Sequence, residues 1–170
     1  MVIWITGLSA SGKTTLATTF FENYKKKIPN LVLLDGDIIR DLFGNNLGYT
    51  VDDRIKQINR IQKLSLFLEK QSIVVVVAVL YSDNNSLAEN KNIFNDYMEV
   101  YLKGTIEQLK NREFKNLYKD ALEGKTINVV GVDIPWIEPE NPDIIFNLSE
   151  NLSPNEMSKI LFKKLNNNVK

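Results

Sequence analysis

The stretch Gly7-Leu8-Ser9-Ala10-Ser11-Gly12-Lys13-Thr14 decides the fold, because it matches the pattern G-x-x-x-x-G-K-[ST] at every defined position. The apolar run Val2–Thr6 precedes it and predicts a short buried strand. The segment Thr14–Lys26 follows it with apolar residues at helical spacing. A glycine-rich loop between a strand and a helix cradles phosphate oxygens with its backbone N–H groups and the positive end of the helix dipole. The sequence therefore predicts that this loop binds a nucleoside triphosphate.

The phosphate loop also predicts individual contacts to ATP and to magnesium. Gly7 and Gly12 permit the tight turns that point backbone N–H groups inward. The Lys13 ammonium can reach the β- and γ-phosphates, and the Thr14 hydroxyl can ligate Mg²⁺. We expect ATP to contact Gly7, Ser9, Ala10, Ser11, Gly12, Lys13, Thr14 and Thr15.

Apolar runs alternate with amphipathic stretches along the chain, and this alternation is typical of an α/β fold with a parallel sheet. The nearly all-valine run Ile73–Leu80 suits a central strand that is buried on both faces. We expect strands at Val2–Thr6, Leu31–Leu34, Ile73–Leu80, Met98–Leu102 and Ile144–Asn147. We expect helices at Thr14–Lys26, Ile38–Leu42, Asp52–Lys70, Leu87–Asp96, Thr105–Gly124 (one or two helices) and Pro154–Asn166, the last with Ser153 as its N-cap. The pattern predicts one P-loop NTPase domain over residues 1–170, a three-layer αβα fold with a mainly parallel five-stranded sheet.

Composition excludes several classes of chemistry. The 170 residues contain no cysteine and no histidine, which excludes disulfides, thiolate metal sites and Ser-His-Asp hydrolysis. The 21 basic and 21 acidic side chains cancel, so we expect neither a nucleic acid nor a membrane surface as partner. No apolar run approaches the roughly 20 residues that span a bilayer, and the short apolar start lacks the features of a signal peptide. We therefore expect a cytoplasmic protein.

A phosphate loop serves switches, motors and kinases alike, and the sequence favours a small-molecule kinase. The Asn-Lys-x-Asp base reader of guanine switches has only the incomplete match Asn90-Lys91-Asn92-Ile93. Motor ATPases are generally larger than this chain. A kinase needs an acceptor site and a lid that excludes water. A non-catalytic nucleotide-binding module is the alternative from another class.

The end of the second expected strand supplies candidate catalytic groups. Asp35 can take a proton from an acceptor hydroxyl and help to hold magnesium. Asp37 either contributes to the acceptor site or caps the helix Ile38–Leu42. Arg40, Arg54 and Arg60 lie within a short window, which favours recognition of an anionic substrate over surface salt bridges.

Two further segments are expected to surround the site. Residues 109–125 carry Arg112, Lys115 and Lys119 and are predicted to form a basic lid over the ATP phosphates; the alternative is a solvated charged helix. Residues 128–143 contain three prolines and are predicted to form a loop over the acceptor site. Ligands collect at the carboxyl ends of strands in such sheets, where both segments would lie.

Taken together, these motifs resemble those of the adenylylsulfate kinases, which move the ATP γ-phosphate onto the ribose 3′-hydroxyl of adenosine 5′-phosphosulfate. The resemblance covers nearly the whole chain, and its motifs are Gly7–Thr15, Leu34–Arg40, Leu47–Tyr49 with Asp53-Arg54, Asn116–Lys119, and Gly131–Asp133 running into Glu138–Pro142. It implies that Asp35 is the catalytic and magnesium-organising carboxylate, with Lys13 at the phosphates. It implies acceptor contacts from Asp37, Arg40, Tyr49 (stacked on the base) and Arg54, a lid with Arg112 and Lys119, and a homodimer.

The departures from this family fall on the acceptor side. Gln57 stands where the family has Asn, and Tyr81 stands where it has a serine followed by arginines. Val129 replaces the phenylalanine that closes an aromatic sandwich on the acceptor adenine, unless Trp136 or a partner chain supplies the ring. We place Gln57, Tyr81 and Val129 in an altered acceptor site. The chain is therefore identified as a divergent member, similar to cytidine diphosphoramidate kinase; the alternative acceptor is adenylylsulfate, giving 3′-phosphoadenylylsulfate.

Overall fold

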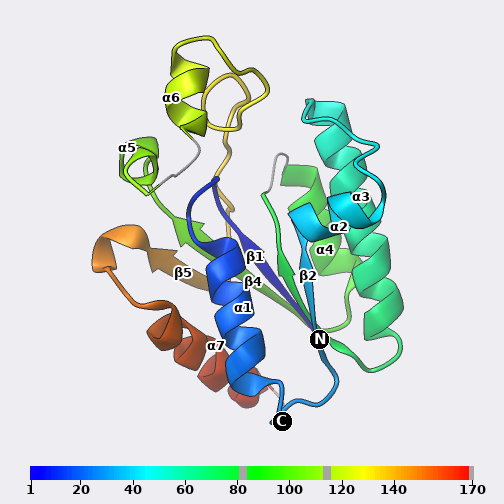
Figure 1. Cartoon of the computed structure of the whole chain (residues 1–170). Helices are drawn as coiled ribbons and strands as arrows, with labels where there is room; N and C mark the ends of the chain where they lie inside the picture. The colour runs from blue at the N-terminus through cyan, green and yellow to red at the C-terminus, as the bar shows by residue number, and fades with distance from the viewer. Residues whose placement is uncertain (81–83, 113–115, 169–170) are drawn as a thin grey trace.

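The computed structural model describes residues 1–80, 84–112 and 116–168, which form a parallel sheet between two layers of helices (Figure 1). The strands are β1 (Val2–Thr6), β2 (Leu31–Asp35), β3 (Val74–Ala78), β4 (Tyr97–Lys103) and β5 (Ile144–Asn147). Their order is β2-β3-β1-β4-β5, and every pairing is parallel. The predicted P-loop three-layer fold is thereby confirmed, with a sheet that is wholly rather than mainly parallel.

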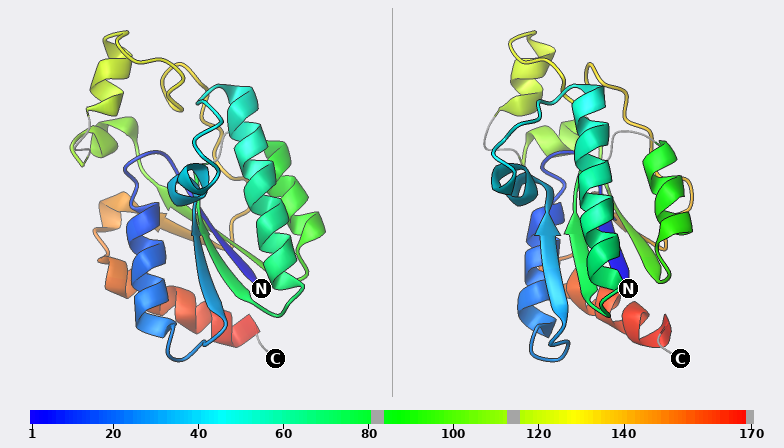
Figure 2. Two further views of the ribbon diagram at one scale, coloured as in Figure 1. Left: turned by 45° about the vertical axis from the view of Figure 1, so that its right-hand side comes forward. Right: turned by 90° about the vertical axis from the view of Figure 1, so that its right-hand side faces the viewer.

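Helices cover both faces of this sheet, as Figure 2 shows from two sides. One face carries α1 (Lys13–Tyr24) and α7 (Pro154–Asn168), and the other carries α3 (Val51–Glu69) and α4 (Asn84–Ile93). Three shorter elements follow strand ends: α2 (Gly36–Leu42), α5 (Ile106–Lys110) and the 3₁₀ turn η1 (Leu148–Glu150), and α6 (Leu117–Leu122) comes after α5. The segment expected as one or two charged helices is thus two short ones, α5 and α6.

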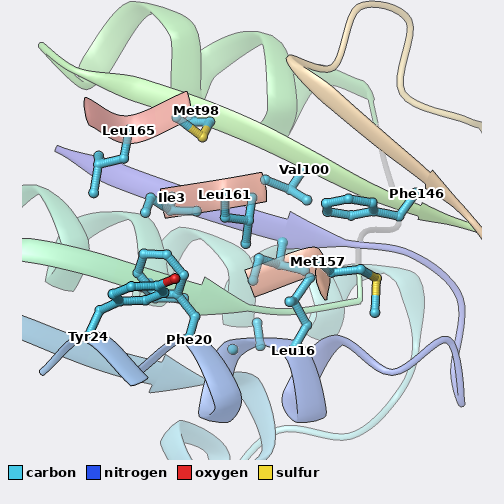
Figure 3. Packing of buried hydrophobic residues seen from close by; sticks show 14 of the residues in the cluster. Ile3, Leu16, Phe20, Tyr24, Met98, Val100, Phe146, Met157, Leu161 and Leu165 are labelled. Atoms are coloured by element: carbon cyan, nitrogen blue, oxygen red, sulfur yellow. The ribbon is translucent and has the colours of Figure 1, made fainter. Parts of the chain in front are cut away.

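The core on the α1–α7 face follows directly from the apolar periodicity of these helices. Leu16 and Phe20 of α1 and Leu161 of α7 are fully buried against the strands (Figure 3). The Tyr24 and Phe162 rings stack with centroids 3.9 Å apart and join the two helices. This packing fixes α1, and so fixes the loop that leads into it.

Helix ends are set by side chains close in sequence. The Ser153 hydroxyl accepts from the backbone N–H of Glu156, whose carboxylate in turn accepts from the Ser153 N–H, so the predicted cap of α7 is confirmed. Asp37 does not cap α2 as one interpretation had it. Asp35 is the cap, because its carboxylate accepts from the backbone N–H of Asp37 at 2.9 Å.

Within the described residues, no helix has the length and apolar character to cross a membrane.

Candidate active site

The phosphate loop connects β1 to α1 at the carboxyl end of the central strand. Gly7 has φ 149°, and a Cβ there would lie 2.6 Å from the Leu102 carbonyl oxygen, so only glycine fits. Gly12 has φ 96° and begins α1 without a side-chain cap. The first N–H groups of α1 therefore remain available to an anion at this loop.

Lys13 curls over the loop from the first turn of α1. Its Nζ donates to the Leu8 carbonyl oxygen at 2.7 Å. Burial lowers the pKa of Lys13 to about 8, although the nearby carboxylates of Asp37 and Asp35 favour its charged form. The ammonium is therefore still mostly charged at neutral pH and lies against the backbone of the loop at Leu8.

Thr14 and Asp35 place two oxygen atoms together beside this lysine. The Thr14 hydroxyl donates to Asp35 Oδ2 at 2.6 Å, which joins α1 to the end of β2. Hydroxyl and carboxylate oxygens are the donors that Mg²⁺ prefers, and the ion usually completes its shell with water and substrate phosphates. Among the described residues, no group of three or more acidic side chains could hold a metal alone. The pair thus fits an ion that arrives with a nucleotide.

A cavity of about 730 Å³ opens above this pair. It brings together twelve of the residues singled out from the sequence: Ser9, Ala10, Gly12, Lys13, Thr14, Thr15, Asp35, Asp37, Tyr49, Arg54, Arg112 and Val129. The lining does not include Gly7, Ser11, Arg40, Gln57 or Lys119. Tyr81 and Lys115 lie outside the described residues.

Arg40 and Gln57 are buried behind the cavity wall, where they hold other residues in place. Arg40 Nη1 donates to the carbonyl oxygens of Leu47 and Gly48 at 2.8 and 2.9 Å. Its guanidinium carbon lies 4.7 Å from the centre of the Tyr49 ring. Gln57 Nε2 donates to the carbonyl oxygen of Gly36 at 3.1 Å. Both side chains thus fix the backbone on which Asp37 and Tyr49 stand.

Arg54 joins the two sides of the cavity. Its Nε donates to the Tyr49 carbonyl oxygen at 2.9 Å, and its Nη2 donates to the Asn128 carbonyl oxygen at 2.8 Å. Burial and the adjacent Arg40 cation lower the pKa of Arg54 from its ordinary value, but a guanidinium stays protonated at any physiological pH. Arg54 therefore keeps a positive charge between the Tyr49 wall and the loop at Asn128.

Val129 is buried and is held by Asp133. The Asp133 carboxylate accepts from the backbone N–H groups of Asn128 at 2.5 Å and of Val129 at 2.6 Å. These hydrogen bonds lower the pKa of Asp133, so the carboxylate stays ionised. The apolar wall at Val129 is thus a fixed part of the cavity.

Trp136 belongs to a different cavity, of about 330 Å³, beside Leu8 and Ile106. Its ring packs against Tyr101 with centroids 6.1 Å apart, and its Nε1 donates to the Tyr101 hydroxyl at 3.3 Å. The larger cavity's lining contains Tyr49 and Val129 but not Trp136. Trp136 consequently does not replace the missing aromatic ring at Val129.

Several lining residues in and after the predicted lid segment were not expected from the sequence. They are Leu117, Asp120, Thr126, Ile127 and Asn128. Leu117 and Asp120 are three residues apart on α6 and share a face, whereas the exposed Lys119 between them does not line the cavity. The three-residue spacing of Leu117 and Asp120 could have indicated that they share one helix face. The prediction was based on positive charge and therefore selected the lysines.

Comparison with known proteins agrees with this geometry. Residues 1–147 match the adenylylsulphate kinase family. A cytidine diphosphoramidate kinase of Campylobacter jejuni is 35% identical over 164 residues, which is 96% of this chain and 95% of that protein. An adenylyl-sulfate kinase of Bacteroides thetaiotaomicron is 36% identical over 154 residues, covering 88% of this chain and 76% of that protein. Among solved structures, the Mycobacterium tuberculosis APS kinase in complex with AMPPNP and APS superposes with a TM-score of 0.88, at 26% identity over 97% of this chain and 96% of that one.

Proposed function

The chain belongs to the adenylylsulphate kinase family of phosphotransferases, and on that premise we propose that it phosphorylates the ribose 3′-hydroxyl of cytidine diphosphoramidate with ATP. The observation that supports this choice of acceptor is the described part of the cavity wall, which offers one exposed aromatic ring, Tyr49, and the aliphatic Val129. A relative named for this acceptor, matched over 95% of its own length, supports it.

The loop residues bind and orient ATP in this proposal. The N–H groups at the start of α1 and the Lys13 ammonium meet the β- and γ-phosphates, while Arg112 approaches from the lid side of the cavity. Bound Mg²⁺, held with Thr14 and Asp35, would neutralise charge on the phosphates. These groups stabilise the charge that develops as the γ-phosphoryl group leaves ADP.

Asp35 acts on the acceptor. Its Oδ1 is engaged with the first turn of α2, which holds the carboxylate at the carboxyl end of β2. Asp35 would accept the proton of the 3′-hydroxyl as that oxygen attacks the γ-phosphorus in line. The 3′-hydroxyl oxygen is itself the nucleophile and ADP is the leaving group, so the transfer is direct and forms no phosphoenzyme.

The cavity walls at Tyr49 and Val129 favour a small acceptor base. A purine held between two aromatic faces gains about 1–3 kcal/mol per stack. Among the cavity-lining residues that the structure describes, Tyr49 supplies one such face and Val129 stands where the family has the other. Because Val129 is fixed by Asp133, it cannot swing to fill the space under a larger ring. A single-ring base stacked on Tyr49 suits this cavity better than adenine does.

Adenylylsulfate is the alternative acceptor, and the comparison with relatives supports it equally. The 36% identity to an adenylyl-sulfate kinase equals that to the cytidine diphosphoramidate kinase within a percentage point. Under this alternative a partner chain would supply the second ring, which agrees with the predicted homodimer.

A coupled ADP-release assay with saturating ATP separates the two. We expect the kcat/KM for cytidine diphosphoramidate to exceed that for adenylylsulfate. A higher kcat/KM for adenylylsulfate than for every cytidine acceptor would overturn the proposal. Light scattering of the purified protein, with and without nucleotides, tests the homodimer.

A further inference from the structure

Among residues 1–80, 84–112 and 116–168, the charges that line the large cavity are balanced. This lining contains three cations, Lys13, Arg54 and Arg112, and three carboxylates, Asp35, Asp37 and Asp120. Lys13 and Arg112 are needed at the ATP phosphates. Of the cations in the described lining, Arg54 is then left for the acceptor, beside three carboxylates. A strongly anionic acceptor tail would be poorly compensated.

Of these three carboxylates, Asp120 is the one to which the proposed mechanism gives no role. Asp35 is engaged with Thr14 and α2, and Asp37 lies near enough to Lys13 and Arg54 to affect the pKa of both. Within residues 1–80, 84–112 and 116–168, no hydrogen bond or ion pair joins the Asp120 carboxylate to another side chain. A half-buried carboxylate in a cavity gains most from a ligand that donates a hydrogen bond to it.

The backbone holds Asp120 at a defined place in the lid. The Asp120 carbonyl oxygen accepts from the N–H groups of Lys125 and Thr126, at 2.8 and 3.3 Å. The preceding helix turn is tied to the phosphate loop, because the Tyr118 hydroxyl donates to the Ser9 carbonyl oxygen at 3.1 Å. Figure 1 shows α6 and the first turns of α3, which follow Tyr49, on opposite sides of the carboxyl end of the sheet. Asp120 and Tyr49 thus line the same cavity from two segments far apart in the chain, α6 and the loop before α3.

We propose that Asp120 is a specificity-determining residue that accepts a hydrogen bond from an amino group of the acceptor nucleotide. This inference rests on the proposed function and deepens it. Two amino groups share the required chemistry: the exocyclic amine of cytosine, to which carboxylates pair elsewhere, and the terminal amide of a phosphoramidate tail. The same carboxylate repels an ionised sulfate or phosphate at the tail position. Asp120 therefore both favours an amine and disfavours adenylylsulfate.

The test compares Asp120→Ala and Asp120→Asn with wild type on four acceptors in the ADP-release assay. They are cytidine diphosphoramidate, uridine diphosphoramidate (no base amine), cytidine diphosphate (no tail amine) and adenylylsulfate. We expect Asp120→Ala to lower kcat/KM for cytidine diphosphoramidate by roughly 10- to 100-fold, as for loss of a hydrogen bond to a charged group. For the analogue that lacks the recognised amine, Asp120→Ala should lower kcat/KM by less than about 3-fold. The analogue that shows this small loss identifies the amine to which Asp120 binds. Asp120→Asn, which keeps an acceptor oxygen without the charge, should fall between wild type and Asp120→Ala.

Glu123→Gln is the matched control, because Glu123 is an exposed lid carboxylate three residues away that does not line the cavity. Glu123→Gln should leave kcat/KM for every acceptor unchanged. The KM for ATP should stay within about 2-fold of the wild-type value in all variants. Equal losses on all acceptors, or a raised KM for ATP, would assign Asp120 to the ATP side or to the lid itself and overturn the inference. A preference of the wild-type protein for adenylylsulfate would instead overturn the proposed function. Failure of the inference is therefore seen in the Asp120 variants, and failure of the proposed function is seen in the wild type.

Discussion

Replacing Val129 with phenylalanine should move the acceptor preference toward adenine. The new ring would supply a second aromatic face in the cavity that Tyr49 lines. Base–aromatic stacking is worth about 1–3 kcal/mol, which corresponds to roughly 5- to 150-fold in kcat/KM for adenylylsulfate. Val129 is only 4% exposed, so a ring that stayed in the core would overpack it at a cost of about 1–3 kcal/mol. We expect the ring to turn into the cavity, because the open volume lies on that side.

The assay is the ratio of kcat/KM for adenylylsulfate to that for cytidine diphosphoramidate, measured for wild type, Val129→Phe and Val129→Leu. Leucine enlarges the side chain without an aromatic face, so Val129→Leu should change the ratio by less than about 3-fold. Thermal melting of each variant separates a packing defect from a change of preference. If leucine shifted the ratio as far as phenylalanine does, stacking would be the wrong explanation. An unchanged ratio in a well-folded Val129→Phe protein would refute the role of this wall altogether.

Three other predictions concern charged groups. Lys13→Ala and Asp35→Asn should each lower kcat by at least about 100-fold with the melting temperature nearly unchanged, and turnover close to wild type in either variant would contradict the mechanism. The buried Lys13 has a pKa of about 8, so kcat/KM for ATP should fall as the pH rises through that value; a flat profile from pH 7 to 9 would argue against it. Burial raises the pKa of Glu99 above its ordinary value, so stability is lost as the pH rises through the raised pKa. Glu99→Gln, which can still accept from the Tyr97 hydroxyl, should gain melting temperature relative to wild type as the pH is raised above the ordinary glutamate pKa, and a constant difference would refute the assignment.

The fold was predictable because its signals are local and repeat along the chain. The phosphate loop fixed one strand and one helix, and the valine run at β3 indicated a buried parallel strand. Ends were less certain: the expected strand Ile73–Leu80 is Val74–Ala78 in the structure, because pairing with β1 and β2 ends there. Hydrophobic pattern gives the middle of a strand, whereas the pairing partner sets its ends.

The site was harder to predict, because sequence gives the order of side chains but not their direction. By residue type, either Asp35 or Asp37 could cap α2. Because β2 continues through Asp35, the carboxylate of Asp35 is the one in position to cap this helix. Arg40 resembles a substrate ligand by residue type, but its guanidinium is used by the carbonyl oxygens of Leu47 and Gly48. Asp120 was overlooked because a carboxylate in a basic segment does not suggest a nucleotide site. Such roles depend on contacts between segments far apart in the chain.

The central claim is a transfer of phosphate to a ribose hydroxyl, and ³¹P NMR of a reaction of the wild-type protein with ATP, Mg²⁺ and cytidine diphosphoramidate tests it most directly. A new phosphomonoester resonance coupled to the ribose H3′ should grow in step with ADP. Inorganic phosphate growing in step with ADP, without that resonance, or a phosphate added to the diphosphoramidate tail, would contradict the claim.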